Sequence, residues 1–554
     1  MFRKCYLIPL GFLLLCALFL VLSKDAYLLL PPIVAIGLAF WTKNVLFSIF
    51  MGTFVGSVVS LGAFKFENIF KGFLRVGDHY LVEAVADSGR AGLILFTMTI
   101  GGMVALVTQS GGLNKLLSSM IGFANTTVKA QLLMFGTGLL VFFDDYANTI
   151  IVGNLYRSLS DKYKISREKF SFIIDSTAAP VASLSIVSTW VAYEIGLINA
   201  AVEKLGIEQD GFDLFISSLP HRYYAIFMLF FIVMTIVMRR DWGPMHNAEL
   251  RARKTGDVYR PDSKPMMAKE VEDWQLKVKS NGTAAMGWLP ILVLLMVVLV
   301  GFWISGKSSL VGDNKFNAQT TLRDILGASD AIVVLIWGAL VSTAVAMVMT
   351  VWGKVFSFDE SFEVWLEGVK SMVLPIVILV FAWGLSAVMD ELKSGEVLSH
   401  VLEGKVYVHL VPALIFLMSF LMAFATGTSW GTMAILFPLA IPLAHGLMVA
   451  QGLDPDISLT ILSATVGSIL TGSIFGDHIS PISDTTIMSS IWAGIDHMDH
   501  VQSQMPYALF IGGVSTVVGY LPAGFGISPW ITLPIGLAVM FVVLKWKGKQ
   551  IPLN

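Results

Sequence analysis

The stretch GDHISPISDTTIMSS, residues 476–490, places two acids, a histidine and a proline inside apolar sequence of membrane-crossing length. Three further polar clusters interrupt apolar sequence in the same way: FFDDYANT at 142–149, DSTAAPVASLS at 175–185 and TGTSWGT at 426–432. An acid at the bilayer centre costs about 2.5–3.5 kcal/mol on insertion scales, so such residues are rare and functional by default. The four clusters therefore guide the interpretation of the whole chain.

The sequence around these clusters is strongly apolar. The chain has 554 residues, 55% hydrophobic and only 14% charged, against roughly a quarter charged in ordinary soluble domains. Mean hydropathy is +0.75. One core could not bury so much apolar surface, which predicts a polytopic membrane protein in a lipid bilayer and excludes a water-soluble enzyme. The net charge of −2 implies no nucleic-acid partner, and Cys5 and Cys16 offer no disulfide framework.

Apolar stretches of crossing length recur from end to end, which favours helices over the alternating strands of a barrel. We predict an all-α polytopic membrane protein with about twelve transmembrane helices. The expected spans are 6–22, 27–41, 44–63, 91–109, 170–198, 223–238, 286–305, 331–352, 370–390, 456–490, 505–521 and 530–545.

Two further apolar segments, 129–160 and 408–447, are predicted to be re-entrant helical hairpins. Lys and Arg near helix ends should lie in the cytoplasm, and they do so throughout only if both segments enter and leave the membrane on one side. Such backbone is tolerated where it lines a cavity buried in protein or filled with water. The order span, span, hairpin, interrupted span, span then occurs twice with opposite polarity, as in the inverted-topology repeats of secondary transporters.

The predicted organisation has six parts, with both termini in the cytoplasm. They are N-terminal helices in 1–43, a first repeat in 44–238 whose hairpin near 129–160 faces the cytoplasm, a solvated cytoplasmic linker in 239–285, a connecting helix and outer loop in 286–330, a second repeat in 331–521 whose hairpin near 408–447 faces outward, and a C-terminal helix with a basic tail in 522–554.

The residues of the clusters suit a small cation. Pro180 and Pro481 should break their helices where Ser, Thr and Asp are densest. Freed carbonyls, hydroxyls and carboxylates are hard ligands of the kind that sodium prefers, whereas no zinc spacing and no phosphate loop occur. Burial favours the protonated form of a carboxyl and a bound cation favours the ionised form. Competition between sodium and a proton for one group is a mechanism for exchange.

The candidate residues differ in how strongly they point to function. For Asp145, Asp175 and Asp484 we predict a sodium site, because nothing else explains acids at that depth. Asp144 and His478 are candidate proton-relay groups, with helix capping and a structural histidine as the alternatives. Packing or back-bonding is the favoured interpretation of four serines, Ser183, Ser185, Ser489 and Ser490.

Long stretches around the clusters resemble the NhaC-type sodium/proton antiporter family of the ion-transporter superfamily. They are FFDDYANTIIVGN, IIDSTAAPVASLSIVSTW, TGTSWGTMAILFPLAIP and FGDHISPISDTTIMSS, and the resemblance extends over nearly the whole chain. It implies a bacterial inner-membrane transporter, often a homodimer, that moves by an elevator-like or rocking step. It implies no cofactor and makes sodium the transported or coupling ion.

The resemblance also implies a two-part binding site. One half would come from Asp145, Asn148, Thr149, Asp175, Ser176 and Thr177. The other half would come from Thr428, Ser429, Thr432, Asp477, Ser480, Asp484 and Thr485.

Two functions stay open at this point. The first is exchange of cytoplasmic sodium for external protons. The second is sodium- or proton-coupled transport of a small organic solute, either an amino acid or a carboxylic acid such as malate or lactate. In that case backbone amides at 147–149 and 428–431 would hold a carboxylate, as helix N-termini do.

Overall fold

A computed structural model describes residues 26–552 of this protein with gaps at 43, 63–65, 119–120, 204, 206, 208–210, 266–277, 280, 313–315, 317–324, 326–328, 395–396, 398–399 and 402–404. The predicted span 6–22, with both cysteines, lies outside the described residues. Within them the regular secondary structure is helical apart from one short antiparallel pair of strands. In this pair β1 (Arg240–Asp241) meets β2 (Lys549–Gln550). That pair ties the chain end to the middle of the sequence.

The first half of the chain ends in a hairpin, a bent pair and a long helix. Its helices are α2 (Leu30–Thr42), α3 (Val45–Ser60), α4 (Phe66–Arg75), α5 (Val82–Ala86), α6 (Ser88–Gln109), α7 (Gly112–Ser118), the hairpin α8 (Thr127–Leu140) with α9 (Asp145–Lys162), the bent pair α10 (Arg167–Leu184) with α11 (Thr189–Val202), α12 (Gly211–Ser218) and α13 (Tyr223–Met238).

The second half repeats that order after a polar segment. Its helices are α14 (Gly243–Thr255), α16 (Ala284–Gly312), α18 (Ala331–Trp352), α19 (Phe358–Ser371), α20 (Val373–Glu391), the hairpin α22 (Val411–Thr426) with α23 (Ser429–Ala450), the pair α24 (Pro455–Ile479) with α25 (Asp484–Ala493), α26 (His497–Val514), α27 (Leu521–Gly524) and α28 (Pro529–Lys547).

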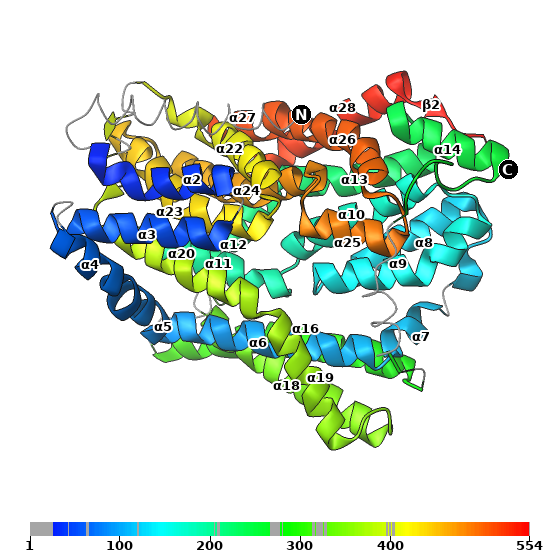
Figure 1. Ribbon diagram of the computed structural model, residues 1–554, viewed down its shortest axis with the longest axis horizontal. Coiled ribbons are helices and arrows are strands. Elements are labelled where there is room, and N and C mark those ends of the chain that lie inside the picture. The colour runs from blue at the N-terminus through cyan, green and yellow to red at the C-terminus, as the bar shows by residue number, and fades with distance from the viewer. Residues whose placement is uncertain are drawn as a thin grey trace.

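The helices are long and apolar enough for a multi-pass membrane protein. Among the described residues nine helices could each cross a bilayer. The number rises to eleven if α10 with α11, and Gly211–His221 with α13, each count as one bent span. Figure 1 shows the two hairpins on opposite sides of the molecule along its long axis, α8 and α9 in the right half and α22 and α23 in the left half. The count of twelve crossings and the inverted repeats stay predictions.

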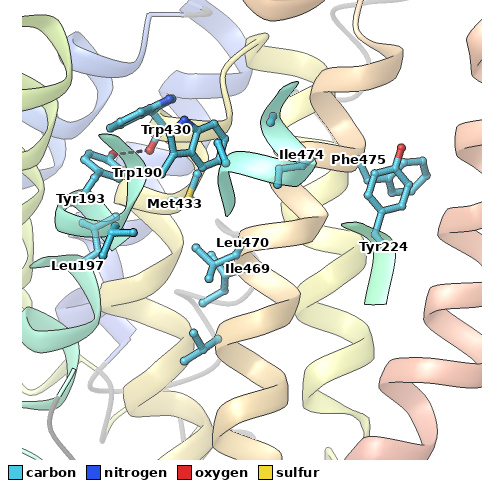
Figure 2. Packing of buried hydrophobic residues seen from close by; sticks show 14 of the residues in the cluster. Trp190, Tyr193, Leu197, Tyr224, Trp430, Met433, Ile469, Leu470, Ile474 and Phe475 are labelled. Atoms are coloured by element: carbon cyan, nitrogen blue, oxygen red, sulfur yellow. Dashed lines mark hydrogen bonds between the residues drawn. The ribbon is translucent and has the colours of Figure 1, made fainter. Parts of the chain in front are cut away.

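A cluster of aromatic and aliphatic side chains joins the first bent pair to the second hairpin. Figure 2 shows Trp190, Tyr193 and Leu197 of α11 beside Trp430 and Met433 of α23. The Tyr193 hydroxyl donates to the Trp430 carbonyl at 2.5 Å, and the Trp190 and Trp430 rings meet edge to face with centroids 5.4 Å apart. Large aromatic surfaces with a satisfied polar end stabilise such contacts. The cluster thus fixes the tip of the second hairpin against the first half of the chain.

The structure corrects the prediction that Pro180 breaks its helix. Helix α10 continues past Pro180 to Leu184, and the 52° bend to α11 follows at residues 185–188. A proline inside a helix removes one hydrogen bond. Here nearly every residue of α10 is buried by its neighbours, and this packing outweighs that loss. Pro481 does lie in a break, between α24 and α25.

The polar segment after α13 differs from the prediction of a solvated linker, because part of it is buried. Helix α14 buries Glu249, which accepts a hydrogen bond from the backbone of Ser166 at 2.8 Å. Burial raises the pKa of Glu249, while the neighbouring Arg253 guanidinium opposes that shift. Helix α14 therefore packs on the start of α10 as part of the fold.

Candidate functional site

At both hairpin tips the second helix begins with a side-chain N-cap. Asp144 begins α9 by accepting a hydrogen bond from the backbone of Ala147 at 2.7 Å, and Thr428 begins α23 by accepting one from Gly431 at 3.3 Å. Such capping satisfies amides that the first helical turn leaves without partners. Asp144 also accepts from the Thr189 hydroxyl of α11 at 2.9 Å. The predicted relay residue Asp144 is therefore a helix cap that joins the first hairpin to the first bent pair.

Asp175 lies at the centre of a polar cluster formed by three helices. Its side chain is 1% exposed. One carboxylate oxygen accepts from the Ser489 hydroxyl of α25 at 3.0 Å. The other accepts from the Gln504 amide of α26 at 2.6 Å and from the Thr486 hydroxyl at 3.3 Å. Among the described residues, the group within 4.0 Å that can carry a positive charge is His500, whose Nε2 lies 3.9 Å away.

Asp477 joins the second hairpin to the second break. Its carboxylate accepts from the backbone amide of Ser429 at 3.1 Å, and its carbonyl accepts from the Thr486 hydroxyl at 3.1 Å. The Ser480 hydroxyl donates to the Phe424 carbonyl of α22 at 2.9 Å. An acid at the N-terminus of a helix is favoured by the positive end of the helix dipole. Asp477 thus anchors α23 to α24.

The turn of the second hairpin requires glycine. Gly427 ends α22 with φ of +72°, a conformation that residues with a Cβ rarely adopt. A Cβ at this position would also lie 2.5 Å from the carbonyl oxygen of Ile482 in the second break. The close approach of hairpin tip and break is therefore possible only without a side chain.

Asn148 performs the equivalent linking role in the first hairpin. Its amide donates to the carbonyls of Gly138, Val141 and Thr177 at 2.6, 3.1 and 3.0 Å, which joins α8, α9 and α10. The amide oxygen of Asn148 and the hydroxyl of Ser176 are buried and have no hydrogen-bond partner among the described residues. Leaving such atoms unpaired costs about 1–3 kcal/mol each, and each needs an explanation. An ion or water would supply the missing partner.

Several predicted ligands use their hydroxyls within their own helix. Thr149 donates to the Asp145 carbonyl at 3.0 Å, Thr177 to the Ile173 carbonyl at 2.8 Å and Thr432 to the Thr428 carbonyl at 2.9 Å. Such back-bonding is ordinary for threonine in helices. Thr485 contacts the Ser483 hydroxyl at 3.0 Å. The backbone of Asp484 begins α25, but its side chain lies outside the described part of the chain.

A cavity of about 620 Å³ opens beside the two hairpin tips. Asp144 and Asp145 line it from the first hairpin, and Thr428 and Trp430 line it from the second. Helices α6, α19 and α20 form the opposite wall. Asp175 and Asp477 are not part of this lining. The predicted site residues are thus divided between an open cavity and a buried cluster behind it.

His478, the second candidate relay group, lies outside the lining of the cavity. Its Nδ1 contacts the Tyr224 hydroxyl at 3.0 Å, and its carbonyl accepts from Gln504 at 2.8 Å. It is fully buried between α13, α24 and α26. The Gln504 amide donates to both the His478 carbonyl and the Asp175 carboxylate, so the backbone of His478 connects it to the polar cluster.

A buried ion pair lies next to the first break. Arg222 contacts Glu194 at 2.9 Å, and both side chains are fully buried. The guanidinium also donates to the Ser183 carbonyl near the end of α10 and packs over the Phe215 ring at 4.7 Å. None of the four polar clusters contains this arginine, so inspection of those clusters missed it. It stabilises the carboxyl end of α10 with positive charge.

Sequence reasoning missed four partners of Asp175. The sequence pattern favours a packing role for Ser489, and it does not mark Thr486, Gln504 or His500 as candidate site residues. One signal was available: His497, His500 and Gln504 are spaced by three and four residues and so lie on one face of a helix. Polar residues with that spacing in an otherwise apolar span indicate a buried partner.

Three relatives and one family model resemble this chain. The model of the Na+/H+ antiporter family matches residues 181–525. An uncharacterized protein of Haemophilus influenzae is 29% identical over 94% of this chain and 96% of its own length. The malate-2H(+)/Na(+)-lactate antiporter of Bacillus subtilis is 26% identical over 34% of this chain and 43% of its own length. The arginine/ornithine antiporter ArcD of Halobacterium salinarum is 30% identical over 34% of this chain and 36% of its own length.

The fold also resembles that of a solved transporter. The YdaH transporter of Alcanivorax borkumensis superposes with a TM-score of 0.56 over 90% of this chain and 99% of that chain, at 14% identity. At that identity the likeness concerns the fold alone. The multi-pass helical architecture and the family match together indicate a transporter and not an enzyme. Because the family model matches more than half of its length, this chain belongs to the Na+/H+ antiporter family.

Proposed function

We propose that this transporter exchanges sodium for protons across the bacterial inner membrane, and that Asp175 alternately holds the two cations. The observation that carries the proposal is the environment of Asp175. Its carboxylate is buried among neutral donors, and within 4.0 Å the described residues offer it no Lys or Arg, only His500. A buried charge without such a partner is strongly unfavourable. A proton or a small bound cation must therefore neutralise it.

The hydroxyls around Asp175 can accommodate either cation. Thr486 lies within hydrogen-bond distance of both the Asp175 carboxylate, at 3.3 Å, and the Asp477 carbonyl, at 3.1 Å. When its hydrogen points to the carbonyl, an oxygen lone pair faces Asp175. Ser489 can turn in the same manner. Carboxylate and hydroxyl oxygens would then face a sodium ion, the kind of ligand that hard cations prefer.

Sodium-driven proton movement in liposomes tests this assignment. Purified protein is reconstituted with an internal pH dye and pulsed with sodium in the absence of organic solute. Asp175→Asn keeps the shape but can bind neither a proton nor a sodium ion in place of the other, so we expect the sodium-driven signal to be abolished. Asp87→Asn is the matched control, because Asp87 is an exposed cap of α6 and Asn caps equally well. Exchange at the wild-type rate in Asp175→Asn would remove this residue from the site.

We also propose the finer topology predicted above, with twelve crossings in two inverted repeats and both termini in the cytoplasm. Support comes from the recurring order of elements, in which α18, α19 and α20 correspond to α3, α4 and α6 and each half continues with a hairpin and a broken pair. Asp257→Cys in a chain without Cys5 and Cys16 should react with an impermeant thiol reagent only from the cytoplasmic side. Reaction from the outside would reverse the assignment.

A second candidate function is coupled transport of a small organic solute through the cavity. Its volume of about 620 Å³ is far larger than one ion needs and suits a small molecule. The amino ends of α9 and α23 begin at this cavity, where they could bind a carboxylate, and Asp145 could bind an ammonium group. Two relatives are named as transporters of hydroxy acids and basic amino acids.

A cavity-filling variant separates the two functions. Val104 of α6 lines the wall opposite the hairpin tips. Val104→Trp should block uptake of labelled lactate, malate, arginine or ornithine while sodium–proton exchange continues. Val449→Trp, at a position 67% exposed on α23, controls for added bulk. Absence of any solute uptake by the wild type would exclude the second candidate.

A further inference from the structure

Five basic residues gather where helices α13 and α28 end, and we call them the basic patch. They are Arg239, Arg240, Lys545, Lys547 and Lys549. The two helices lie side by side and run in the same direction. Near their starts the Thr532 hydroxyl of α28 donates to the Tyr223 hydroxyl of α13 at 2.9 Å, and after their ends β1 pairs with β2. In Figure 1 the end of α28, β2 and α14 lie together at the upper right.

Hydrogen bonds between the two chain segments hold the basic patch together. The Arg240 guanidinium donates to the carbonyls of Lys545 and Gly548 at 3.2 and 2.6 Å. The Ile551 amide donates to the Arg239 carbonyl at 2.8 Å. Together with the β1–β2 pair, these contacts fix the two helix ends against each other. The patch is therefore formed before any ligand arrives.

The protein itself does not neutralise the basic patch. Among the described residues none of its five side chains forms an ion pair. Two acids, Asp241 and Glu249, line the same small pocket as Arg239. Both are buried and already paired, Asp241 with Lys169 at 2.8 Å and Glu249 with Arg253 at 3.2 Å. The positive charge of the patch thus remains available to a partner outside the described chain.

The helix dipoles explain only a small part of this charge. Basic residues are favoured at the carboxyl end of a helix, which carries about half a negative charge. The ends of α13 and α28 together offset about one of the five positive charges. The remaining charge, roughly four units, calls for an anionic partner.

Helix α28 places the basic patch at the boundary between lipid and water. Only 28% of an 18-residue apolar window in this helix is buried, the smallest share among the candidate spans of the described residues. Its exposed face begins near Trp530 and ends near Trp546, which are 73% and 85% exposed. These two residues are separated by roughly 24 Å along the axis, at 1.5 Å per residue. Tryptophan is enriched at both edges of the hydrocarbon core, so the patch beside Trp546 lies at headgroup level.

We propose that the basic patch binds the headgroups of anionic phospholipids. Phosphate oxygens accept from the lysine ammonium groups and the Arg239 guanidinium, while acyl chains pack on the exposed apolar face of α28. Clusters of four to eight basic residues next to a membrane helix are typical of such binding. A soluble anion would use the cations alone, whereas the adjoining apolar face favours a lipid. The site is separate from the proposed exchange, because α28 lines neither the cavity nor the cluster around Asp175.

Lipid binding to the purified full-length protein in detergent tests the site. Native mass spectrometry compares phosphatidylglycerol, phosphatidylcholine with the same acyl chains, and glycerol 3-phosphate as a soluble anion. The wild type should bind phosphatidylglycerol at least about tenfold more tightly than the other two. Combining Lys545→Gln, Lys547→Gln and Lys549→Gln should abolish this preference and leave phosphatidylcholine binding unchanged. Glycerol 3-phosphate binding as tight as that of phosphatidylglycerol would overturn the lipid assignment.

Two control variants separate the position of the charges from their number. Combining Lys162→Gln, Lys164→Gln and Lys254→Gln removes the same charge from exposed lysines on or next to α9 and on α14. This variant should keep the wild-type preference for phosphatidylglycerol. Arginine at all three patch lysines keeps the charge and should do the same. Equal affinity for phosphatidylglycerol in the two glutamine variants would overturn the patch as the binding site.

A second measurement locates the lipid without changing any patch residue. The protein is reconstituted in phosphatidylcholine liposomes that contain a minor fraction of brominated lipid, which quenches nearby tryptophan. The contribution of Trp546 is the fluorescence that Trp546→Phe removes. Brominated phosphatidylglycerol should quench this contribution several-fold more than brominated phosphatidylcholine at the same fraction, because the patch concentrates the anionic lipid. Equal quenching by the two lipids would overturn the proposal.

Discussion

Asp175 and Asp477 occupy similar places in the sequence but very different places in the structure. Each precedes a proline in one of the two broken helix pairs, and each is buried. Asp175 accepts from side chains, those of Ser489, Thr486 and Gln504, whereas Asp477 accepts from the backbone amide of Ser429 at the start of a helix. Side-chain hydroxyls can turn, but a backbone amide cannot.

The difference assigns different tasks to the two acids. A carboxylate held by hydroxyls that can reorient can exchange one cation for another at little structural cost. A carboxylate that accepts from a backbone amide at a helix terminus is held in one position, because that amide cannot turn. We therefore expect Asp175 to exchange one bound cation for another during transport and Asp477 to hold the second hairpin against α24.

Removing each charge in turn should produce the largest contrast. Asp175→Asn should abolish sodium-driven proton movement, as described above. Asp477→Asn weakens a charge-assisted hydrogen bond, worth about 1.5–3 kcal/mol, and should retain measurable exchange with a reduced rate and a lower melting temperature. The dye-loaded liposomes and a thermal melt in detergent measure both. Equal loss of transport in the two variants would end the distinction.

The hydroxyl shared by the two acids offers an intermediate effect. Thr486→Val removes the donor that lies between the Asp175 carboxylate and the Asp477 carbonyl while preserving shape. We expect the apparent affinity for sodium to fall by about tenfold, because one ligand is lost.

Thr460→Val is the control for this substitution. Thr460 lies on α24 and donates to the Asp456 carbonyl at 3.0 Å in an exposed position. An unchanged sodium affinity in Thr486→Val would place the ion elsewhere than between these two acids.

The smallest expected effect tests the close contact between the second hairpin tip and the second break. Gly427→Ala puts a Cβ 2.5 Å from the Ile482 carbonyl in a left-handed conformation, so it should separate the hairpin tip from the break. Gly452→Ala has a similar φ of +62° but nothing within 4 Å of its Cβ, so it isolates the cost of the backbone conformation, about 1 kcal/mol. Melting temperatures measure both.

We expect Gly427→Ala to lower the melting temperature more than Gly452→Ala does. Equal shifts in the two variants would show that the close contact between hairpin tip and break adds nothing to stability.

Much of the helical framework could be predicted from apolar periodicity. The expected spans 223–238 and 331–352 coincide with α13 and α18, since each is a long uniform apolar run with capping or charged residues at its ends. The position of the first break could not be predicted. Pro180 is the strongest local signal, yet tertiary burial of α10 outweighs it and the bend follows at residues 185–188.

Sequence by itself determined that this chain is a membrane protein and made Asp175 a candidate site residue, because low overall charge makes each acid in an apolar run conspicuous. Only the tertiary structure decided which groups surround that acid. Ser489, Gln504 and His500 come more than 300 residues later in the chain than Asp175, with sequence separations of 314, 329 and 325. Local pattern carries no information about such pairs, since helix packing and not sequence proximity brings α10 against α25 and α26.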